Sequence, residues 1–184
     1  MAPQTNLLLS KMKNDQTLSD ITMIIGPEKK TFYGHKLILA LSCPYFYNLF
    51  MSKMSDDKDT VEFQDFCPEC FGIYLDLCYS NIDNVVISKF LTDPKKLFNF
   101  LMIVNYFGSE DHEQFVSNLL ISSLNNTNCI DRHTICIFYS MSKSVGIISQ
   151  YIFDNSRELS EEVNSITCDN FSILVENIKD QRKE

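Results

Sequence analysis

Residues 19–50 constrain the fold of this chain more than any other stretch. The apolar run from Ile21 to Ile25 is followed by Gly-Pro-Glu-Lys at residues 26–29. That tetrapeptide favours a tight turn, because Gly tolerates positive φ and Pro fixes its own φ. Polar and apolar residues then alternate up to Gly34. The pattern predicts two strands joined by a turn, which is a β-hairpin.

Two short helices are predicted directly after the hairpin. The apolar run from Leu37 to Leu41 favours a short buried helix. Ser42 is placed to cap a second helix, with Pro44 in its first turn. The apolar side chains of this second helix share one face and are Tyr45, Phe46, Leu49 and Phe50. The stretch as a whole therefore indicates strands and helices that share one core.

The order of residues in this stretch resembles the BTB/POZ family. The family pattern is an Asp that opens a strand, a hairpin, Phe-x-x-His-Lys/Arg, a Leu-rich helix and then Ser-x-x-Phe. The matching positions are Asp20, Phe32, His35, Lys36, Leu37, Leu39, Ser42 and Phe46. The resemblance implies the α+β BTB/POZ fold, in which helices flank a small sheet, and it implies a protein-interaction module.

A short strand and three helices are expected next. Residues 60–63 alternate as a strand, and Pro68 lies at the start of a helix with an apolar stripe. Asp93 and the following Pro open a second helix, which Gly108 is placed to end. Ser109 is expected to cap the third helix. This order again resembles the BTB/POZ family.

An Asn-rich segment at residues 125–128 marks a predicted domain boundary. The resemblance ends near it, so we expect the BTB/POZ domain to be residues 1–124. Helical sequence continues beyond the boundary, with a break expected at Gly146. This part resembles the start of a BACK domain, the helical module that follows BTB in cullin-3 adaptors. Residues 125–184 are therefore expected to form a partial, all-helical BACK-like segment.

Composition and charge exclude several classes of function. The chain has 16 Lys and Arg against 24 Asp and Glu, a net charge of −8, which disfavours nucleic-acid partners because phosphate contacts need clustered basic residues. No apolar run approaches the roughly 20 residues of a membrane-spanning helix, and no signal-peptide pattern opens the chain. We expect an intracellular protein, cytoplasmic or nuclear. Its many Asn, Ile and Lys residues are typical of AT-rich genomes, viral ones included.

No residue pattern supports catalysis. Cys67 and Cys70 form a CxxC, but no second pair of zinc ligands stands at short spacing from it. His35 has no Ser or Cys nucleophile beside it, so we expect a packed or capping histidine. The sequence predicts a chain that is not an enzyme, binds no metal or cofactor and carries an inert CxxC.

The family resemblance implies a cullin-3 docking motif in the loop after Phe50. Adaptors of this family carry a hydrophobic-x-Glu motif there. Met54 would fill an apolar pocket on the cullin, and Asp56, one methylene shorter than the family's Glu, would supply the acidic contact. Further contacts are expected from Phe50 and from the helices around Tyr106 and His112. The alternative is a solvated acidic loop.

The resemblance also implies a dimer formed through an N-terminal helix. The expected interface residues are Leu7, Leu8, Leu9, Met12, Asp20 and Lys36. Three adjacent leucines cover more than one helical face, although packing on their own domain explains them equally well. Asp20 and Lys36 match a charged pair near that interface in the family. Few residues precede the helix, so we expect the strand that many members exchange between subunits to be missing.

These expectations combine into a dimerising adaptor of a ubiquitin ligase, which links cullin-3 to a substrate protein for ubiquitination. Its partners would be cullin-3, a second copy or another BTB protein, and the substrate. The alternative is a non-catalytic scaffold or decoy that occupies BTB or cullin partners without delivering a substrate. A potassium-channel-type tetramerisation domain is disfavoured, because no transmembrane segment follows. No kelch-like repeats occur.

Overall fold

A computed structural model describes residues 9, 11–51, 59–79, 87, 90–155 and 158–159 of the chain. The chain divides into two compact units, residues 1–119 and residues 120–184. The predicted domain boundary after residue 124 lies close to this division and stays a prediction. Each unit is described separately below.

The predicted hairpin forms the sheet of the first unit. Strands β1 (Ile21–Ile25) and β2 (Lys30–Gly34) pair antiparallel, with Met23 opposite Phe32. Gly26 begins the turn between them with a φ of 72°, a left-handed conformation that Gly adopts without steric cost. These contacts confirm the strand-turn-strand prediction.

A third strand makes β2 an edge of the sheet. β3 (Thr60–Phe63) runs parallel to β1, which gives the strand order β2-β1-β3. On the β2 edge, the Tyr33 backbone N–H donates to Asn14 Oδ1 at 2.9 Å. The preceding residue, Lys13, forms an ion pair with Asp76. The segment before β1 is thus tied to the sheet edge and to a later helix.

Two short helices follow the hairpin, but Ser42 does not cap the second one. Ser42 is the last residue of α2 (Lys36–Ser42), and its hydroxyl donates to the Leu39 carbonyl oxygen at 2.8 Å. Cys43 separates α2 from α3 (Pro44–Met51) and is extended, with φ −154° and ψ 145°. A residue before proline avoids the helical region, so the break falls one residue later than predicted.

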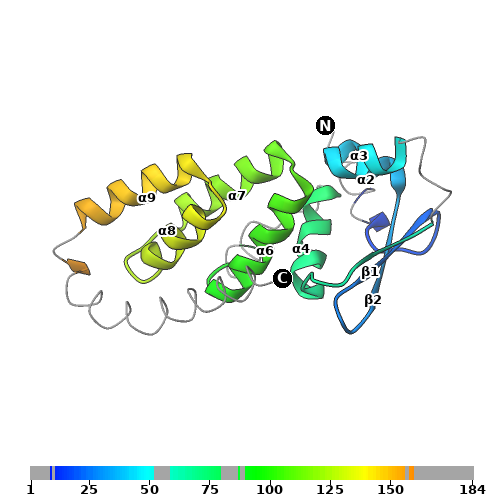
Figure 1. The fold of residues 1–184 in the computed structure, drawn as a ribbon, viewed down its shortest axis with the longest axis horizontal. Coiled ribbons are helices and arrows are strands. Elements are labelled where there is room, and N and C mark those ends of the chain that lie inside the picture. The colour runs from blue at the N-terminus through cyan, green and yellow to red at the C-terminus, as the bar shows by residue number, and fades with distance from the viewer. Residues whose placement is uncertain are drawn as a thin grey trace, which may run out of the picture. The chain divides into compact units, whose positions relative to one another are not determined.

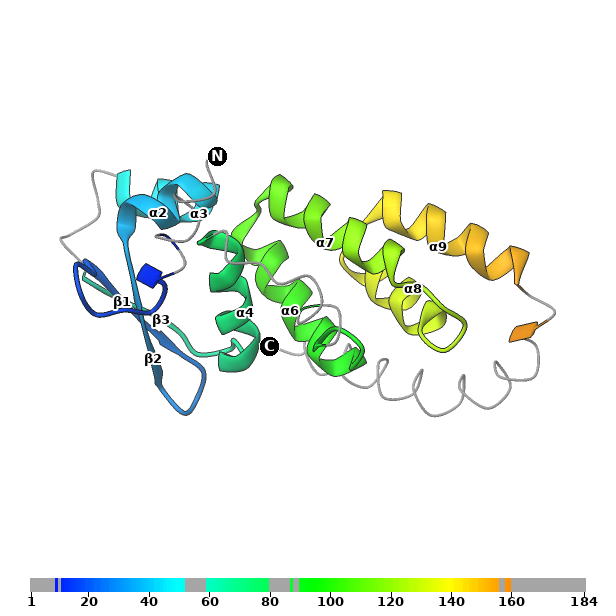
Figure 2. The same ribbon diagram turned by 180° about the vertical axis from the view of Figure 1, so that it is seen from behind.

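Three longer helices follow, and they are α4 (Pro68–Cys78), α6 (Pro94–Phe107) and α7 (Glu110–Ser122). The Asp93 side chain caps α6 by accepting from two backbone N–H groups, and Gly108 ends α6 with a φ of 62°. Ser109 Oγ accepts from the His112 N–H in the first turn of α7 at 3.4 Å. All three capping predictions are confirmed. Figures 1 and 2 show α4 between the sheet and α6.

The predicted apolar faces of these helices form the core of the first unit. The α4 stripe is fully buried and consists of Phe71, Tyr74, Leu75 and Cys78. On α6, the fully buried predicted residues are Leu97, Leu101 and Val104, whereas Phe98 is half-buried. The sheet contributes Met23 and Ile25, which have no exposed surface. This arrangement of a small mixed sheet with flanking helices confirms the α+β fold.

The second unit contains α8 (Cys129–Phe138) and α9 (Ser142–Asp154), which pack against each other (Figure 1). The predicted break at Gly146 is wrong, because Gly146 lies inside α9. The break falls at Ser140, whose φ is 56°. The backbone N–H groups of residues 140 and 141 donate to the carbonyls of residues 137 and 136, the Schellman pattern of a helix end.

A buried arginine closes the end of α7 within the second unit. Arg132 is 2% exposed, and its Nη1 donates to the Leu120 carbonyl oxygen at 2.6 Å and to Ser123 Oγ at 3.1 Å. The last carbonyls of a helix have no partner within the helix, and a cation there is favourable. Burial lowers the pKa of the Arg132 guanidinium.

Candidate functional site

An aromatic cluster fills the middle of the first unit, and Phe107 lies at its centre. The ring centroid of Phe107 is 4.9 Å from that of Phe46, 5.5 Å from Phe63 and 4.7 Å from Tyr74. These rings come from α3, β3 and α4, while Phe107 ends α6. Phe107 is 1% exposed, so one buried ring joins a strand and three helices.

The cluster reaches the surface at Tyr106. This side chain is 51% exposed, yet its ring centroid lies 5.2 Å from those of Tyr45 and Phe66. Tyr45 is half-buried and itself contacts Phe107 at 5.2 Å. Tyr106 therefore presents one side to solvent while the aromatic core holds the other, an arrangement that fits a protein-contact residue.

Phe50 and His112 join the same cluster at other points. Phe50 is half-buried and stacks on Phe46, with centroids 5.7 Å apart. His112 Nδ1 lies 3.2 Å from the Tyr74 hydroxyl, and its ring meets that of Tyr74 edge-on at 5.3 Å. Burial lowers the pKa of His112 below its ordinary value of 6.5. Three predicted cullin contacts, distant in sequence, thus belong to one cluster.

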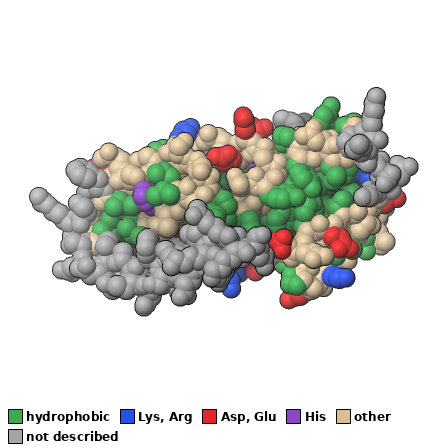
Figure 3. All heavy atoms as spheres, in the orientation of Figure 1, with side chains coloured by type: hydrophobic (Ala, Val, Ile, Leu, Met, Phe, Trp, Pro, Cys, Tyr) green, Lys and Arg blue, Asp and Glu red, His purple; other side chains and the backbone are tan. Residues whose placement is uncertain are grey.

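The other two predicted cullin contacts, Met54 and Asp56, lie outside the described residues. The outer side of α3 carries exposed apolar side chains, since Tyr47 is 54% exposed and Met51 is 61% exposed. Figure 3 shows hydrophobic side chains gathered on the visible face of the first unit, around α4 and the strands. Apolar surface of this kind is typical of an interaction module.

Leu37 and Leu41 are surface residues, which corrects the prediction of a buried helix. They are 68% and 80% exposed, and only Leu39 of α2 is fully buried. The short helix α2 packs on α3 and α4, which leaves its outer side exposed. The two leucines stand four residues apart, a spacing that places them on one face and could have identified them. Sequence reasoning missed both as candidates for contact with a second molecule.

Of the predicted dimer residues, Leu9 and Met12 are half-buried, whereas Leu7 and Leu8 lie outside the described residues. Asp20 and Lys36 do meet, but not as a pair of charged side chains. Asp20 Oδ1 accepts from the Lys36 backbone N–H at 2.6 Å. The Lys36 ammonium instead pairs with Asp59 Oδ1 at 2.9 Å.

The first turn of α2 explains this correction. His35 stands at the N-cap position without a side-chain hydrogen bond to the helix, so the first N–H of α2 needs another acceptor. Asp20 supplies that acceptor from the residue before β1, and its negative charge suits a helix N-terminus. The contact positions α2 on the sheet rather than burying an ion pair.

His35 and the CxxC both contribute to packing. His35 is buried, and its Nδ1 lies 2.7 Å from the Tyr79 hydroxyl, which confirms the packed histidine. Burial raises the pKa of Tyr79 to about 12. Cys67 is the N-cap residue of α4, while Cys70 is buried and burial raises its pKa. A raised pKa disfavours the thiolate that redox chemistry and zinc binding need. The inertness of the CxxC stays a prediction.

Within the described residues, no cluster of three or more His, Cys, Asp or Glu side chains is placed to hold a metal ion. In the same part of the chain, none of the helices has the length and apolar character to cross a membrane.

Comparison with known proteins agrees with this description. A family model for the BTB/POZ domain matches residues 9–124. The chain is 26% identical over 159 residues to human BTB/POZ domain-containing protein 9, covering 84% of this chain and 25% of that protein. It is 26% identical over 158 residues to human Kelch-like protein 31, covering 85% and 23%. It is 24% identical over 159 residues to Kelch repeat protein M-T9 of myxoma virus, covering 85% and 30%. The chain thus spans less than a third of the length of these relatives.

Proposed function

Because this chain belongs to the BTB/POZ family, whose domain is a non-catalytic protein-interaction module, we propose that it dimerises and acts as a cullin-3 adaptor of a ubiquitin ligase. In this proposal residues 1–124 form the BTB/POZ domain, and residues 125–184 form part of a BACK-like helical segment. The adaptor would hold cullin-3 on one surface and a substrate protein on another.

The aromatic cluster is the observation that carries the cullin-3 proposal. It holds Phe50, Tyr106 and His112 together around Phe107 and leaves Tyr106 half-exposed. In the sequence, Met54 follows the last residue of α3 by three positions. Methionine has an adaptable, polarizable side chain and is enriched at protein interfaces.

Calorimetry with the N-terminal region of cullin-3 tests this proposal. Met54→Ala should cost about 1–3 kcal/mol of binding free energy, because an apolar anchor in a pocket is an interface hot spot. Asp56→Ala should cost less, since a rim charge is screened by solvent and acts mainly on the association rate. Asp56→Glu should match or exceed the native affinity.

A matched control for Met54→Ala is Leu18→Ala, which also removes an apolar side chain and lies before β1, outside the proposed cullin contacts. Leu18 is 80% exposed, and its replacement should leave cullin binding unchanged. Native affinity in Met54→Ala, or no binding by the native chain, would favour the alternative of a scaffold or decoy that delivers no substrate.

The proposed dimer rests on the N-terminal helix and on the exposed side of α2. Leu37 lies in the first turn of α2 and is 68% exposed. Burying this apolar side chain against a second copy would stabilise the dimer. Light scattering should give about twice 21.3 kDa for the native chain, and Leu37→Glu should shift the mass toward the monomer. A dimer that survives both Leu37→Glu and loss of residues 1–13 would contradict this interface.

A further inference from the structure

The outer side of β3 is an edge of the sheet. The strand order β2-β1-β3 places β3 last among the described strands. The Thr22 N–H donates to the Asp59 carbonyl oxygen at 2.7 Å, so residue 59 directs its backbone groups toward β1. Successive residues of a strand direct these groups to opposite sides. The N–H and C=O groups of Thr60 and Glu62 therefore face away from β1.

The two edges of the sheet differ in what occupies them. Among the described residues, none forms a hydrogen bond with the backbone of Thr60 or Glu62, and both residues are exposed. On the opposite edge, the Tyr33 N–H of β2 is occupied by the Asn14 side chain. An edge with unoccupied N–H and C=O groups can pair with an extended segment of another chain. β3 thus offers the open edge.

The side chains along β3 determine which segment suits this edge. Glu62 and Asp65 are exposed, and neither forms an ion pair with a Lys or Arg that the structure describes. Val61 lies on the other face of the strand and is half-buried. Because cross-strand neighbours share a face, an added strand places one side chain beside Glu62 and the next beside Val61. A complementary strand alternates Lys or Arg with apolar residues.

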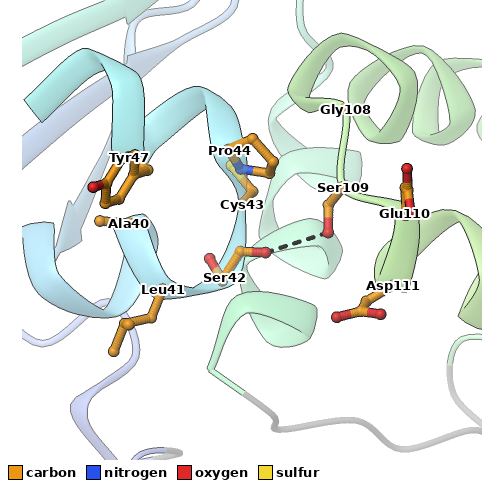
Figure 4. A pocket seen from close by; sticks show the side chains of 10 residues that line it. All are labelled: Ala40, Leu41, Ser42, Cys43, Pro44, Tyr47, Gly108, Ser109, Glu110 and Asp111. Atoms are coloured by element: carbon orange, nitrogen blue, oxygen red, sulfur yellow. Dashed lines mark hydrogen bonds between the residues drawn. The ribbon is translucent and has the colours of Figure 1, made fainter. Parts of the chain in front are cut away.

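We propose that the β3 edge binds an extended segment of a partner protein in which basic and apolar residues alternate. A second copy suits the edge less well, because pairing two β3 edges would bring like charges together in a chain of net charge −8. The edge shares no residue with the proposed cullin contacts. It shares none with the groove of about 510 Å³ that α2, α3 and the start of α7 line (Figure 4).

Amide hydrogen exchange of the native chain, followed residue by residue with NMR, tests whether the edge is open. The Thr60 and Glu62 N–H groups should exchange at least about tenfold faster than the Val61 N–H, which faces β1. Equal protection of all three would mean that the chain itself covers the edge, and this result overturns the proposal.

Selection of random 12-residue peptides displayed on phage, with the native chain as bait, tests the occupant. Enriched peptides should alternate Lys or Arg with Val, Ile or Phe. Only every second N–H of an added strand faces β3. Methylating those backbone nitrogens in one enriched peptide should therefore lower its affinity, measured by fluorescence anisotropy, about tenfold or more, while methylating the intervening ones should not. Enriched peptides without this alternation, or with no such period of two, contradict strand addition.

Glu62→Pro tests the edge on the protein side. It removes an outward N–H but no bond to β1, and an edge strand tolerates proline at such a position. The peptide should bind this variant about tenfold or more weakly. Glu62→Gln should weaken it about threefold and flatten its dependence on salt, because the charge is screened by ions.

The matched control is Thr31→Pro on β2. Thr31 lies two residues before Tyr33, so its N–H also faces away from β1, on the opposite edge of the sheet. This variant should bind the peptide like the native chain. Native affinity in Glu62→Pro, or equal losses in Glu62→Pro and Thr31→Pro, overturns the proposal.

Discussion

The ends of the helices are capped in different ways in the two units. In the first unit, α6 begins at an Asp93 cap and ends at Gly108 in the left-handed region, and Phe107 anchors it in an aromatic core. In the second unit, α8 ends at Ser140 in the same left-handed region, and its N-cap makes no side-chain bond to the helix. The buried cation of Arg132, which lies within α8, instead donates to acceptors at the end of α7.

The difference shows two sources of stability. In α6 of the first unit, local capping and apolar burial support the same structure, although this unit also holds Asn14, Leu18 and Lys29 at positive φ. The second unit accepts backbone strain at Ser140 and depends on hydrogen bonds from a desolvated guanidinium. Buried polar contacts of this kind are costly when one partner is removed. The second unit should therefore tolerate fewer substitutions at its polar positions.

The largest effect should come from the central ring of the first unit. Phe107→Ala should cost about 3–5 kcal/mol of unfolding free energy, because it leaves a cavity where three helices and β3 meet.

Arg132→Ala should cost about 2–3 kcal/mol of unfolding free energy in the second unit, because two hydrogen bonds from a charged donor are lost. Hydrogen exchange followed by mass spectrometry assigns each loss to its unit. Arg132→Met keeps most of the side-chain volume and should recover part of the loss; equal protection in all variants would contradict both assignments.

The left-handed positions should respond with opposite signs. Gly108→Ala should destabilise by about 1–2 kcal/mol, because a Cβ is strained at a φ of 62°. Ser140→Gly should stabilise by about 0.5–1 kcal/mol, because it relieves that strain at a φ of 56°. Thermal unfolding of both variants measures the contrast. A melting temperature that falls in both would show that the Ser140 side chain contributes more than its backbone strain costs.

The smallest expected contrast is in pH dependence. His112 has a lowered pKa in the folded first unit, so the unfolded chain takes up a proton first and stability falls as pH drops from 6.5 toward that lowered pKa. Burial raises the pKa of Asp131 in the second unit, so the folded state takes up the proton first. Its contribution to stability therefore rises as pH drops through that raised pKa toward 3.8. Urea unfolding across this pH range should lose the first trend in His112→Gln and the second in Asp131→Asn.

Local signals made most of the first unit predictable. The turn at Gly26 and the cap at Asp93 depend on residues a few positions apart, so the sequence contains all that determines them. β1 and β3 lie far apart in the sequence, so no local pattern predicts their parallel pairing. At Ser140 a residue other than Gly adopts the left-handed region, so the sequence has no glycine that would indicate the end of α8.

The residues of the candidate site were also predictable only in part. The family resemblance identified Tyr106 and His112, and the structure brings both into one cluster. Phe107 was missed, because α6 is apolar over more than one face and periodicity alone does not mark its central ring. The exposure of Leu37 and Leu41 was missed because burial depends on which neighbours pack against α2. Contacts between segments, rather than residue types, decide these cases.

The contact between Asn14 and the edge of the sheet bears on solubility. An edge strand with a free N–H is a template on which another chain can add a strand and aggregate. In β2, the Tyr33 N–H is occupied by the Asn14 side chain, and the Lys13–Asp76 ion pair holds the adjoining residue in place. Removing this segment exposes the edge. Asn14→Ala should therefore precipitate sooner on concentration than the native chain while keeping the same helical content.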